Sequence, residues 1–242
     1  MLKASHTFKI VNRAMGKALH RYHMIGDGDR ILVGLSGGKD SFTLLWMLNE
    51  RRTRVPVHYE IFPVYIDPGF EPAIGARLED FCRENHMALR VEYTDNGIVA
   101  HSAENRENPC FLCSWRRRKR LFEIAEELKC NKLAVGHTKD DIIETLFINM
   151  CYSGEISTMT PVQSFFNDRF MLIRPLAFVD ENMTRRFSEE MGFPKFENPC
   201  PSATLSKRRE IKNLLSALYR SNKKIKGNLF SSLSRVRMEY LL

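Results

Sequence analysis

The chain has 242 residues, 43% of them hydrophobic and 27% charged, which fits a globular protein with a substantial core and excludes a low-complexity or fibrous chain. No stretch is long and apolar enough to span a membrane, and the N-terminus mixes cations with polar residues instead of forming a signal-peptide core, so we expect a cytoplasmic protein with no membrane association. The formal net charge of +8 favours polyanionic partners, among them nucleic acids.

The first predicted element is an N-terminal helix that lies on the main domain. Apolar residues between positions 6 and 24 recur close to helical spacing, and the glycine–aspartate pairs at 26–29 end this pattern. We therefore assign residues 1–28 to this helix.

The most informative stretch is the glycine-rich turn at residues 36–41, which follows an apolar run and precedes leucines at helical spacing. This order predicts a strand, a tight loop and a helix. Gly37 and Gly38 lack a Cβ, so the backbone can approach a bulky anion, and the N–H groups that open the next helix face that anion. Ser36 and Ser41 add hydroxyl donors. The turn is therefore predicted to bind phosphate.

Lys39 adds a positive charge to this loop, and Asp40 follows it. The Walker A pattern needs serine or threonine directly after the lysine, so it is not met. The order Ser-Gly-Gly-x-Asp-Ser instead resembles the signature of the PP-loop, or N-type, ATP pyrophosphatases. The resemblance implies cleavage of ATP between the α and β phosphates and the use of AMP to activate a carbonyl oxygen. The alternative is a glycine turn that only connects two elements.

Beyond this loop, short β-rich runs alternate with helical patterns, and the polar segment 94–109 is expected to be a loop. The alternation is typical of an α/β fold with a parallel sheet and helices on both faces. With the loop, it predicts a PP-loop ATPase of the adenine nucleotide alpha hydrolase-like (Rossmann-like) type. The ligand crevice is expected at the carboxyl ends of the strands, near Asp67, Gly136 and His137. The expected strands are 58–66, 89–93 and 132–135, and the expected helices are 71–87, 111–129 and 140–151.

The pattern is weaker beyond residue 153. Residues 161–166 and 170–173 are expected to form two short strands around an Asn-Asp turn, and a helix is expected near 180–191. The tail between 205 and 238 contains ten Lys or Arg residues and a single acid, Glu210, so it is strongly basic.

Six cysteines in a chain expected to be cytoplasmic indicate reduced thiols. Cys110 and Cys113 form a C-x2-C pair where a loop meets a helix, a spacing at which two sulfurs can hold a metal. Cys200 repeats the Asn-Pro-Cys setting of Cys110 and is the third candidate ligand. Three thiolates suit an iron–sulfur cluster with one open iron, or a zinc ion with an outside fourth ligand such as His101 or water. A redox C-x-x-C pair is a further alternative, which needs a different strand context.

The other three cysteines have apolar neighbours. Cys82, Cys130 and Cys151 lie in helical or helix-end contexts, and we expect them to pack in the core.

Four motifs occur in a fixed order: the phosphate loop, the cysteine pair, Gly-His-Thr-Lys-Asp-Asp at 136–141 and Ile-Arg-Pro-Leu-Ala at 173–177. This order resembles the tRNA 2-thiocytidine synthetase family, iron–sulfur-dependent tRNA thiolases of the PP-loop superfamily. The resemblance runs from about residue 29 to residue 200. It implies that Cys110, Cys113 and Cys200 hold a 4Fe-4S cluster whose unligated iron carries the sulfur to be transferred. Many members have a further cysteine where this chain has alanine, at position 203, which favours three ligands over four.

The implied chemistry replaces a base carbonyl oxygen with sulfur after adenylation turns that oxygen into part of AMP. The loop is expected to hold the β and γ phosphates while Lys39 and Mg²⁺ neutralise the departing pyrophosphate. Asp40 and the pair Asp140 and Asp141 are hard oxygen ligands suited to that ion. The two carboxylates of the pair diverge on a helix, so we expect Asp141 to serve the site. The alternative is a first helical turn enriched in acids because of its dipole.

Two further residues have a functional and a structural interpretation. His137 contacts ATP or only caps the end of a strand. Asp67 recognises the ribose or adenine or only forms a turn. Because they follow strands at the expected ligand crevice, we assign both, with Gly136, to the nucleotide site.

A run of five consecutive cations next to Trp115, at 116–120, is expected to bind RNA phosphates, the alternative being a solvated helix face. The cations of the tail and the N-terminal helix are expected to complete this RNA-binding surface. The target base has to leave its loop to reach ATP and the cluster.

We therefore expect an ATP- and iron–sulfur-dependent tRNA sulfurtransferase acting on a cytidine of the anticodon loop. The expected partners are tRNA, ATP and a sulfur donor, either sulfide or the persulfide of a cysteine desulfurase, and the resemblance suggests a homodimer. The expected units are the helix 1–28, the ATP-binding and thiolation domain 29–204 and the basic helical tail 205–242. The alternatives are a thiolase of tRNA uridine, an amidating ligase with structural zinc, and an RNA-binding module that is not an enzyme.

Overall fold

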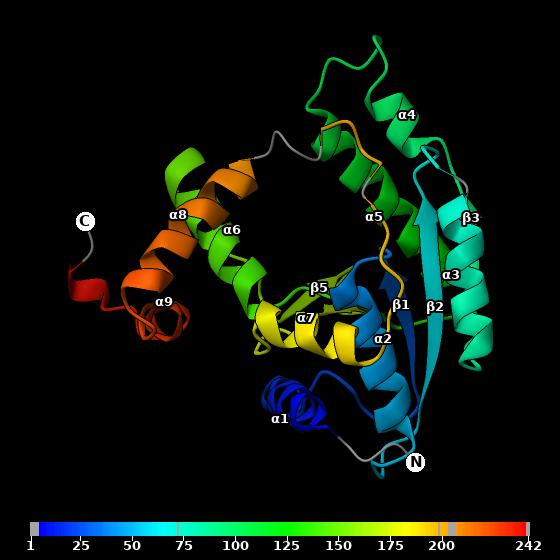
Figure 1. The fold of residues 1–242 in the computed structure, drawn as a ribbon, viewed down its shortest axis with the longest axis horizontal. Coiled ribbons are helices and arrows are strands. Elements are labelled where there is room, and N and C mark those ends of the chain that lie inside the picture. The colour runs from blue at the N-terminus through cyan, green and yellow to red at the C-terminus, as the bar shows by residue number, and fades with distance from the viewer. Residues whose placement is uncertain (1–4, 72, 198, 203–206, 241–242) are drawn as a thin grey trace.

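The computed structural model describes residues 5–71, 73–197, 199–202 and 207–240 (Figure 1). The described residues contain a sheet of six strands in the order β3-β2-β1-β4-β6-β5. Five of these strands are parallel, and β5 runs antiparallel to β6. The strands are β1 (Asp29–Leu35), β2 (Tyr59–Asp67), β3 (Arg90–Tyr93), β4 (Lys132–Ala134), β5 (Val162–Phe165) and β6 (Phe170–Ile173).

Helices cover both faces of this sheet, which confirms the predicted fold class (Figure 1). Ile31 and Val33 of β1 pack in a core with α1, α2, α3 and α7, whereas Leu32 between them packs in a second core with α5. Successive side chains of a strand alternate between faces, so this apolar run is a strand buried on both sides. The helices are α1 (His6–Arg21), α2 (Lys39–Arg52), α3 (Ala73–Glu84), α4 (Asn96–Ala100), α5 (Pro109–Glu127), α6 (Lys139–Tyr152), α7 (Glu181–Glu190), α8 (Lys207–Ser221) and α9 (Ile225–Ser232), followed by a 3-10 turn (Met238–Tyr240).

The basic tail forms helices that pack on α6 and not on the sheet. Ile211 and Leu215 of α8 are buried against Ile143 of α6, with side chains of α9 around them. In Figure 1, α6, α8 and α9 stand together on one side of the molecule. None of the described helices is long and apolar enough to cross a membrane.

Two expectations about local structure are wrong. The segment expected to be a loop, 94–109, contains the five-residue helix α4. The side chain that an alanine would add at Gly97 meets Phe70, so this short helix forms where glycine lets it lie against the preceding turn. Cys151 is exposed, because α6 buries its first turns and its last turn extends into solvent.

The order in which strands are added to the sheet reverses at β1, and this reversal positions the site. The strands β2 and β3 lie on one side of β1, and β4 and β6 lie on the other. The loops after β1 and β4 therefore lead to different helices and leave a crevice between them at the carboxyl ends of the strands. The phosphate loop follows β1, and Gly136 and His137 follow β4.

Candidate functional site

The phosphate loop is a tight turn held by its own serines. Gly37 has a φ of +75°, a conformation that favours glycine, and Gly38 begins α2 without a side-chain cap. Ser41 donates from Oγ to the Gly38 carbonyl (2.9 Å) and accepts from the Ser36 backbone N–H (3.1 Å). The loop thus presents the start of α2, with its positive dipole end, to the crevice.

Lys39 and Asp40 form an ion pair beside this loop. The Lys39 ammonium lies 2.8 Å from the Asp40 carboxylate and 2.9 Å from that of Glu181. The other oxygen of Asp40 accepts a hydrogen bond from Thr184 of α7. Burial raises the pKa of Asp40, and the nearby charge of Asp141 raises it further. These two acids are therefore close enough to interact across the crevice.

Gly136 lets the loop after β4 approach the phosphate loop. A Cβ at Gly136 would lie 3.0 Å from the carbonyl carbon of Asp40 and 3.0 Å from the backbone nitrogen of Ser41. The neighbouring atoms are backbone, so they can move only if the start of α2 moves.

We expect Gly136→Ala to weaken ATP binding because it pushes the two loops apart. Overpacking of this kind costs about 1–3 kcal/mol, which corresponds to about 5- to 150-fold in affinity if the cost falls on the nucleotide site. Calorimetric titration with ATP measures the change. Gly227→Ala is the matched control for chain folding, since Gly227 does not have a positive φ and a Cβ there meets nothing within 4 Å. Equal affinities of Gly136→Ala and the unsubstituted protein would contradict the expectation.

The aspartate pair at the start of α6 points in two directions, as the helical spacing predicts. Asp141 lines the crevice and accepts from the backbone N–H and hydroxyl of Thr138 (2.8 Å each), which completes a capping box. Asp140 accepts from the backbone N–H of Glu181 (2.8 Å) and pairs with Lys226 of α9 (2.6 Å). Asp140 therefore joins α6 to α7 and α9.

His137 faces the crevice as a neutral imidazole. Its Nδ1 accepts a hydrogen bond from Nε of Arg174 (3.2 Å), which leaves the proton on Nε2. Burial and the charge of Arg174 together lower the pKa of His137 to about 4, although the charge of Asp141 opposes this shift. Burial also lowers the pKa of Arg174, to about 10. At neutral pH His137 is therefore a hydrogen-bond donor that carries no charge.

Asp67 is buried at the end of β2, with 1% of its surface exposed. One oxygen accepts from the backbone N–H of Gly69 (2.7 Å), which is the geometry of a turn. The other oxygen has no hydrogen-bond partner among the described residues. A buried acceptor of this kind is costly unless it is paired, so it is suited to a donor from a ligand. Its neighbours Ile66 and Pro68 line the crevice, although Asp67 itself does not.

Three cysteines from two distant segments meet at the start of α5. Asn108 caps this helix by accepting from the backbone N–H of Cys110 (3.0 Å), and Pro109 is its first residue. Cys113 follows one turn later on the same side. Cys110 and Cys200 each lie with Sγ 3.4 Å from the hydroxyl of Ser202, so the two sulfurs are no farther apart than twice that distance.

Cys113 lies close to the other two sulfurs. Burial raises the pKa of its thiol, and the sulfurs of Cys200 and Cys110 raise it further. No three His, Cys, Asp or Glu side chains in the described part of the chain are arranged to hold a single metal ion. A four-iron cluster takes one cysteine per iron and therefore needs sulfurs spread farther apart. Three sulfurs at this place can therefore each serve a separate iron of such a cluster. The alanine at position 203 and Asn198 lie outside the described residues.

His101 lies beside the cysteine cluster and contacts both Ser202 and Cys200. Its Nδ1 lies 2.9 Å from the Gly97 carbonyl, so that nitrogen carries the proton. Its Nε2 lies 3.0 Å from the Ser202 hydroxyl and 3.8 Å from Sγ of Cys200. The lone pair of Nε2 therefore points at the cluster of sulfurs. The remaining buried cysteines, Cys82 and Cys130, each have a pKa raised to about 11 by burial and pack in the core as predicted.

The phosphate loop and the C-x2-C pair open onto two adjoining cavities, whereas Cys200 lines neither of them. A cavity of about 1060 Å³ is lined by Ser36, Asp40, Asp141 and Cys110. An adjoining cavity of about 340 Å³ is lined by Ser36 and Arg117 of the first and also by Gly37, Gly38 and Cys113. The two motifs that the sequence predicts to act together thus border one crevice.

The run of five cations does not act as one surface. Arg117 and Arg118 line the large cavity. Arg120 instead pairs with Glu92, Glu123 and Glu127, at 2.6, 3.1 and 3.1 Å, and joins α5 to β3. Glu92 is distant in sequence, and the two other glutamates lie on the next turns of α5. The sequence alone therefore did not distinguish Arg120, which joins two elements, from the two arginines that line the cavity.

Two arginines of the cavity had no predicted role. Arg174 lies in the Ile-Arg-Pro-Leu-Ala motif, so the motif could have indicated that this arginine belongs to the site. Arg208 comes from α8, and its guanidinium lies 3.1 Å from Asp141 and 3.2 Å from the Thr145 hydroxyl. Nothing in the sequence distinguishes it from the other cations of the tail.

Glu144 lies between α6 and α8 and is 5% exposed. Burial raises its pKa to about 7, while Lys212 and Arg208, both 4.0 Å away, lower it. In the unfolded chain this carboxyl has its ordinary pKa near 4.5. The folded state therefore binds the proton more tightly, and its stability falls as the pH rises from about 4.5 through about 7.

Glu144→Gln is expected to remove this pH dependence. The variant should gain about 3 kcal/mol in free energy of unfolding relative to the unsubstituted protein above pH 7, and almost nothing near pH 4.5. Urea unfolding at several pH values measures this difference. Glu104→Gln, at an exposed residue, is the control, and equal pH profiles for the two variants would contradict the expectation.

A glycine-rich phosphate loop at the switch point of a mostly parallel sheet defines the class of the protein, an α/β nucleotide-binding protein. The PP-loop domain family matches residues 9–217. The tRNA-cytidine(32) 2-sulfurtransferase of Syntrophotalea carbinolica is 37% identical over 238 residues, which cover 97% of this chain and 92% of the relative. Its counterpart from Geotalea daltonii is 38% identical over 239 residues, which cover 97% of this chain and 94% of the relative. The chain belongs to the PP-loop family and, within it, to the family of these tRNA 2-sulfurtransferases.

A solved structure shares the fold. The U34-tRNA thiolase NcsA from Methanococcus maripaludis, determined with its [4Fe-4S] cluster, has a TM-score of 0.78 and 24% sequence identity. The match covers 98% of this chain and 80% of that chain. The two proteins therefore share one fold, which includes the described helices and strands on both sides of the crevice.

Proposed function

We propose that the protein is an ATP-dependent, iron–sulfur-dependent tRNA sulfurtransferase that converts the cytidine at position 32 to 2-thiocytidine. Cytidine 32 is the nucleoside that the names of its relatives give. The observation that supports this most directly is the shared crevice. Ser36, Asp40 and Cys110 line one cavity, so a single base in it can reach both a nucleotide and a sulfur centre.

The first chemical step is adenylation of the base. The O2 atom of cytidine attacks the α phosphorus of ATP, and the bond to the bridging oxygen breaks as pyrophosphate leaves. The N–H groups of Gly37, Gly38 and the start of α2 bind the departing phosphates, and Lys39 and Arg208 neutralise their charge. Because His137 is neutral, its Nε2–H group donates a hydrogen bond to the phosphates without adding positive charge.

Asp40 and Asp141 are the residues that would hold Mg²⁺. Their carboxylates line the same cavity and influence each other's charge, and hard oxygen ligands suit this ion. Bound there, the ion supplies further positive charge to the phosphates. The unpaired oxygen of Asp67 is suited to a donor from adenine or ribose at the end of β2.

The second step replaces the activated oxygen. A sulfur nucleophile attacks C2 of the base, and AMP leaves with the oxygen that the base has lost. Cys110, Cys113 and Cys200 would hold a 4Fe-4S cluster, which when bound supplies an open iron that carries sulfur. The sulfur donor is sulfide or the persulfide of a cysteine desulfurase; from a persulfide, thiol reductants must also supply the two electrons that break its S–S bond. The three cysteines keep this centre at the edge of the nucleotide crevice.

An in vitro reaction tests this function. Protein purified and reconstituted without oxygen is incubated with ATP, Mg²⁺, sulfide and unmodified tRNA, and the nucleosides are analysed by mass spectrometry. We expect 2-thiocytidine and an equal amount of AMP. Cluster-loaded protein that forms neither product overturns the proposal, and thiouridine in place of thiocytidine assigns the protein to the alternative acceptor.

A further inference from the structure

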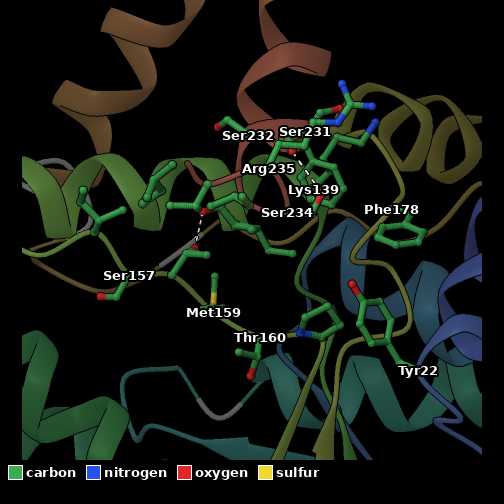
Figure 2. Close-up of a pocket in the computed structure, with 18 of the residues that line it drawn as sticks. Tyr22, Lys139, Ser157, Met159, Thr160, Phe178, Ser231, Ser232, Ser234 and Arg235 are labelled. Atoms are coloured by element: carbon green, nitrogen blue, oxygen red, sulfur yellow. Dashed lines mark hydrogen bonds between the residues drawn. The ribbon is translucent and has the colours of Figure 1, made fainter. Parts of the chain in front are cut away.

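A second large cavity, of about 950 Å³, lies between α1, the loop after α6 and the segment after α9. Figure 2 shows it between the loop of Ser157, Met159 and Thr160, the serines of the tail, and the ring pair of Tyr22 and Phe178. We call it the tail cavity. It is distinct from the nucleotide crevice, and none of the motifs predicted from the sequence lies in it, apart from Lys139.

All charged residues that line the tail cavity are cations. Lys17 and Arg21 come from α1, Lys139 from α6, and Arg235 and Arg237 from the tail. Lys139 is paired with Asp180 (3.2 Å), whereas the other four form no ion pair with any carboxylate in the described part of the chain. Positive charge collected in a concave site without acids attracts a polyanion.

Aromatic rings lie beside these cations. The ring centroid of Phe178 is 5.9 Å from that of Tyr22 and 5.6 Å from that of Phe230. Lys17 lies over Phe178 (5.8 Å), and Lys139 lies over Phe230 (5.6 Å). Rings next to cations are the groups on which single-stranded nucleic acid stacks its bases while its phosphates are neutralised.

The tail cavity adjoins the nucleotide crevice. Thr158, Met159 and Thr160 line both cavities, so this loop is the wall between them. The serines of the tail, at 231, 232 and 234, line the other side of the tail cavity. The hydroxyls of Ser232 and Ser234 donate to the backbone carbonyls of Leu229 (2.8 Å) and Ser231 (3.1 Å), so they hold the shape of this wall. A chain that crosses the loop from the tail cavity therefore arrives at Asp141 and Arg174.

We propose that the tail cavity binds the ribose–phosphate chain of single-stranded RNA next to the nucleotide that enters the crevice. This inference rests on the proposed function and adds to it the surface that guides the RNA. The cations neutralise the phosphates on the flanking nucleotides, and the rings stack with an unpaired base. The helix α1 and the basic tail, far apart in sequence, meet there to form one binding site.

The test is the salt dependence of tRNA binding by the full-length protein. Arg235→Ala/Arg237→Ala removes two cations from the tail wall, and Lys17→Ala/Arg21→Ala removes two from the α1 wall. Each double variant should bind tRNA about tenfold more weakly near physiological salt, and the slope of log K against log salt should fall by about 0.7 for each phosphate that the protein no longer neutralises. Lys223→Ala/Lys224→Ala is the matched control, because it removes the same charge from the same tail outside the cavity.

The outcomes separate this inference from the function on which it rests. If the unsubstituted protein binds and thiolates tRNA while both cavity variants bind it like the control, the tail cavity is not the RNA surface and the inference is overturned. If the variants instead lose self-association in sedimentation at unchanged tRNA affinity, the cavity binds a second copy and the inference is equally overturned. An unsubstituted protein that binds tRNA with the predicted slopes but forms no thiolated base contradicts only the proposed function.

Discussion

Cys200→Ser is expected to abolish tRNA thiolation while leaving ATP binding intact. The Sγ of Cys200 lies 3.4 Å from the Ser202 hydroxyl that also contacts Cys110, so its removal would leave the proposed iron–sulfur cluster with two cysteines. The hydrogen bonds that shape the phosphate loop come from its own serines, so we expect the loop to keep its shape. After anaerobic reconstitution, iron and acid-labile sulfide per chain should drop severalfold, and no 2-thiocytidine should form.

Cys151→Ser is the control for this variant, because Cys151 is exposed at the end of α6 and lines neither cavity of the crevice. It should keep its iron and its activity. Calorimetric titration with ATP gives the second readout, for which all three proteins should agree. Retention of both the cluster and thiolation by Cys200→Ser would show that the third ligand has been assigned wrongly.

Arg208→Ala is expected to slow AMP formation by about 100- to 1000-fold, the usual cost of removing one group that stabilises charge in a transition state. Arg208 enters the crevice from the tail and lies 3.1 Å from Asp141, the residue proposed to hold Mg²⁺ beside the phosphates. Arg208→Lys should recover part of the rate, since a lysine supplies the charge without the forked geometry. The release of pyrophosphate in the presence of tRNA measures the rate.

Arg209→Ala is the matched control, because Arg209 is the neighbouring residue on α8, is exposed and does not line the crevice. Both variants lose the same charge, so a general effect of the tail on tRNA affinity should affect them equally. Saturating tRNA removes that effect and leaves the chemical step. Equal rates for Arg208→Ala and Arg209→Ala would contradict the assignment of Arg208 to the phosphates.

The parts of the fold that the sequence predicts are those set by local chemistry. Gly37 and Gly38 between an apolar run and a leucine-rich helix specify a strand, a tight turn and a helix wherever they occur. The repeated Asn-Pro-Cys setting of Cys110 and Cys200 is a local feature too, and it led to the cysteine cluster that the structure brings together.

What the sequence did not predict depends on contacts between distant segments. Arg120 and Arg208 look like their basic neighbours, and only the packing of α5 on β3 and of α8 on α6 gives them different partners. The helix α4 has five residues, too few for a hydrophobic period. Cys151 was expected in the core because its neighbours are apolar, but the last turn of α6 has no element over it.

The central claim is that the protein adenylates the carbonyl oxygen that sulfur replaces, in the crevice shared by the phosphate loop and the cysteines. The most direct test follows that oxygen atom, with tRNA whose target cytidine carries a heavy oxygen isotope at O2. Mass spectrometry of the AMP formed should find the heavy oxygen in its phosphate in proportion to the thiocytidine produced. Unlabelled AMP, with the heavy isotope released to water, would contradict adenylation of the base.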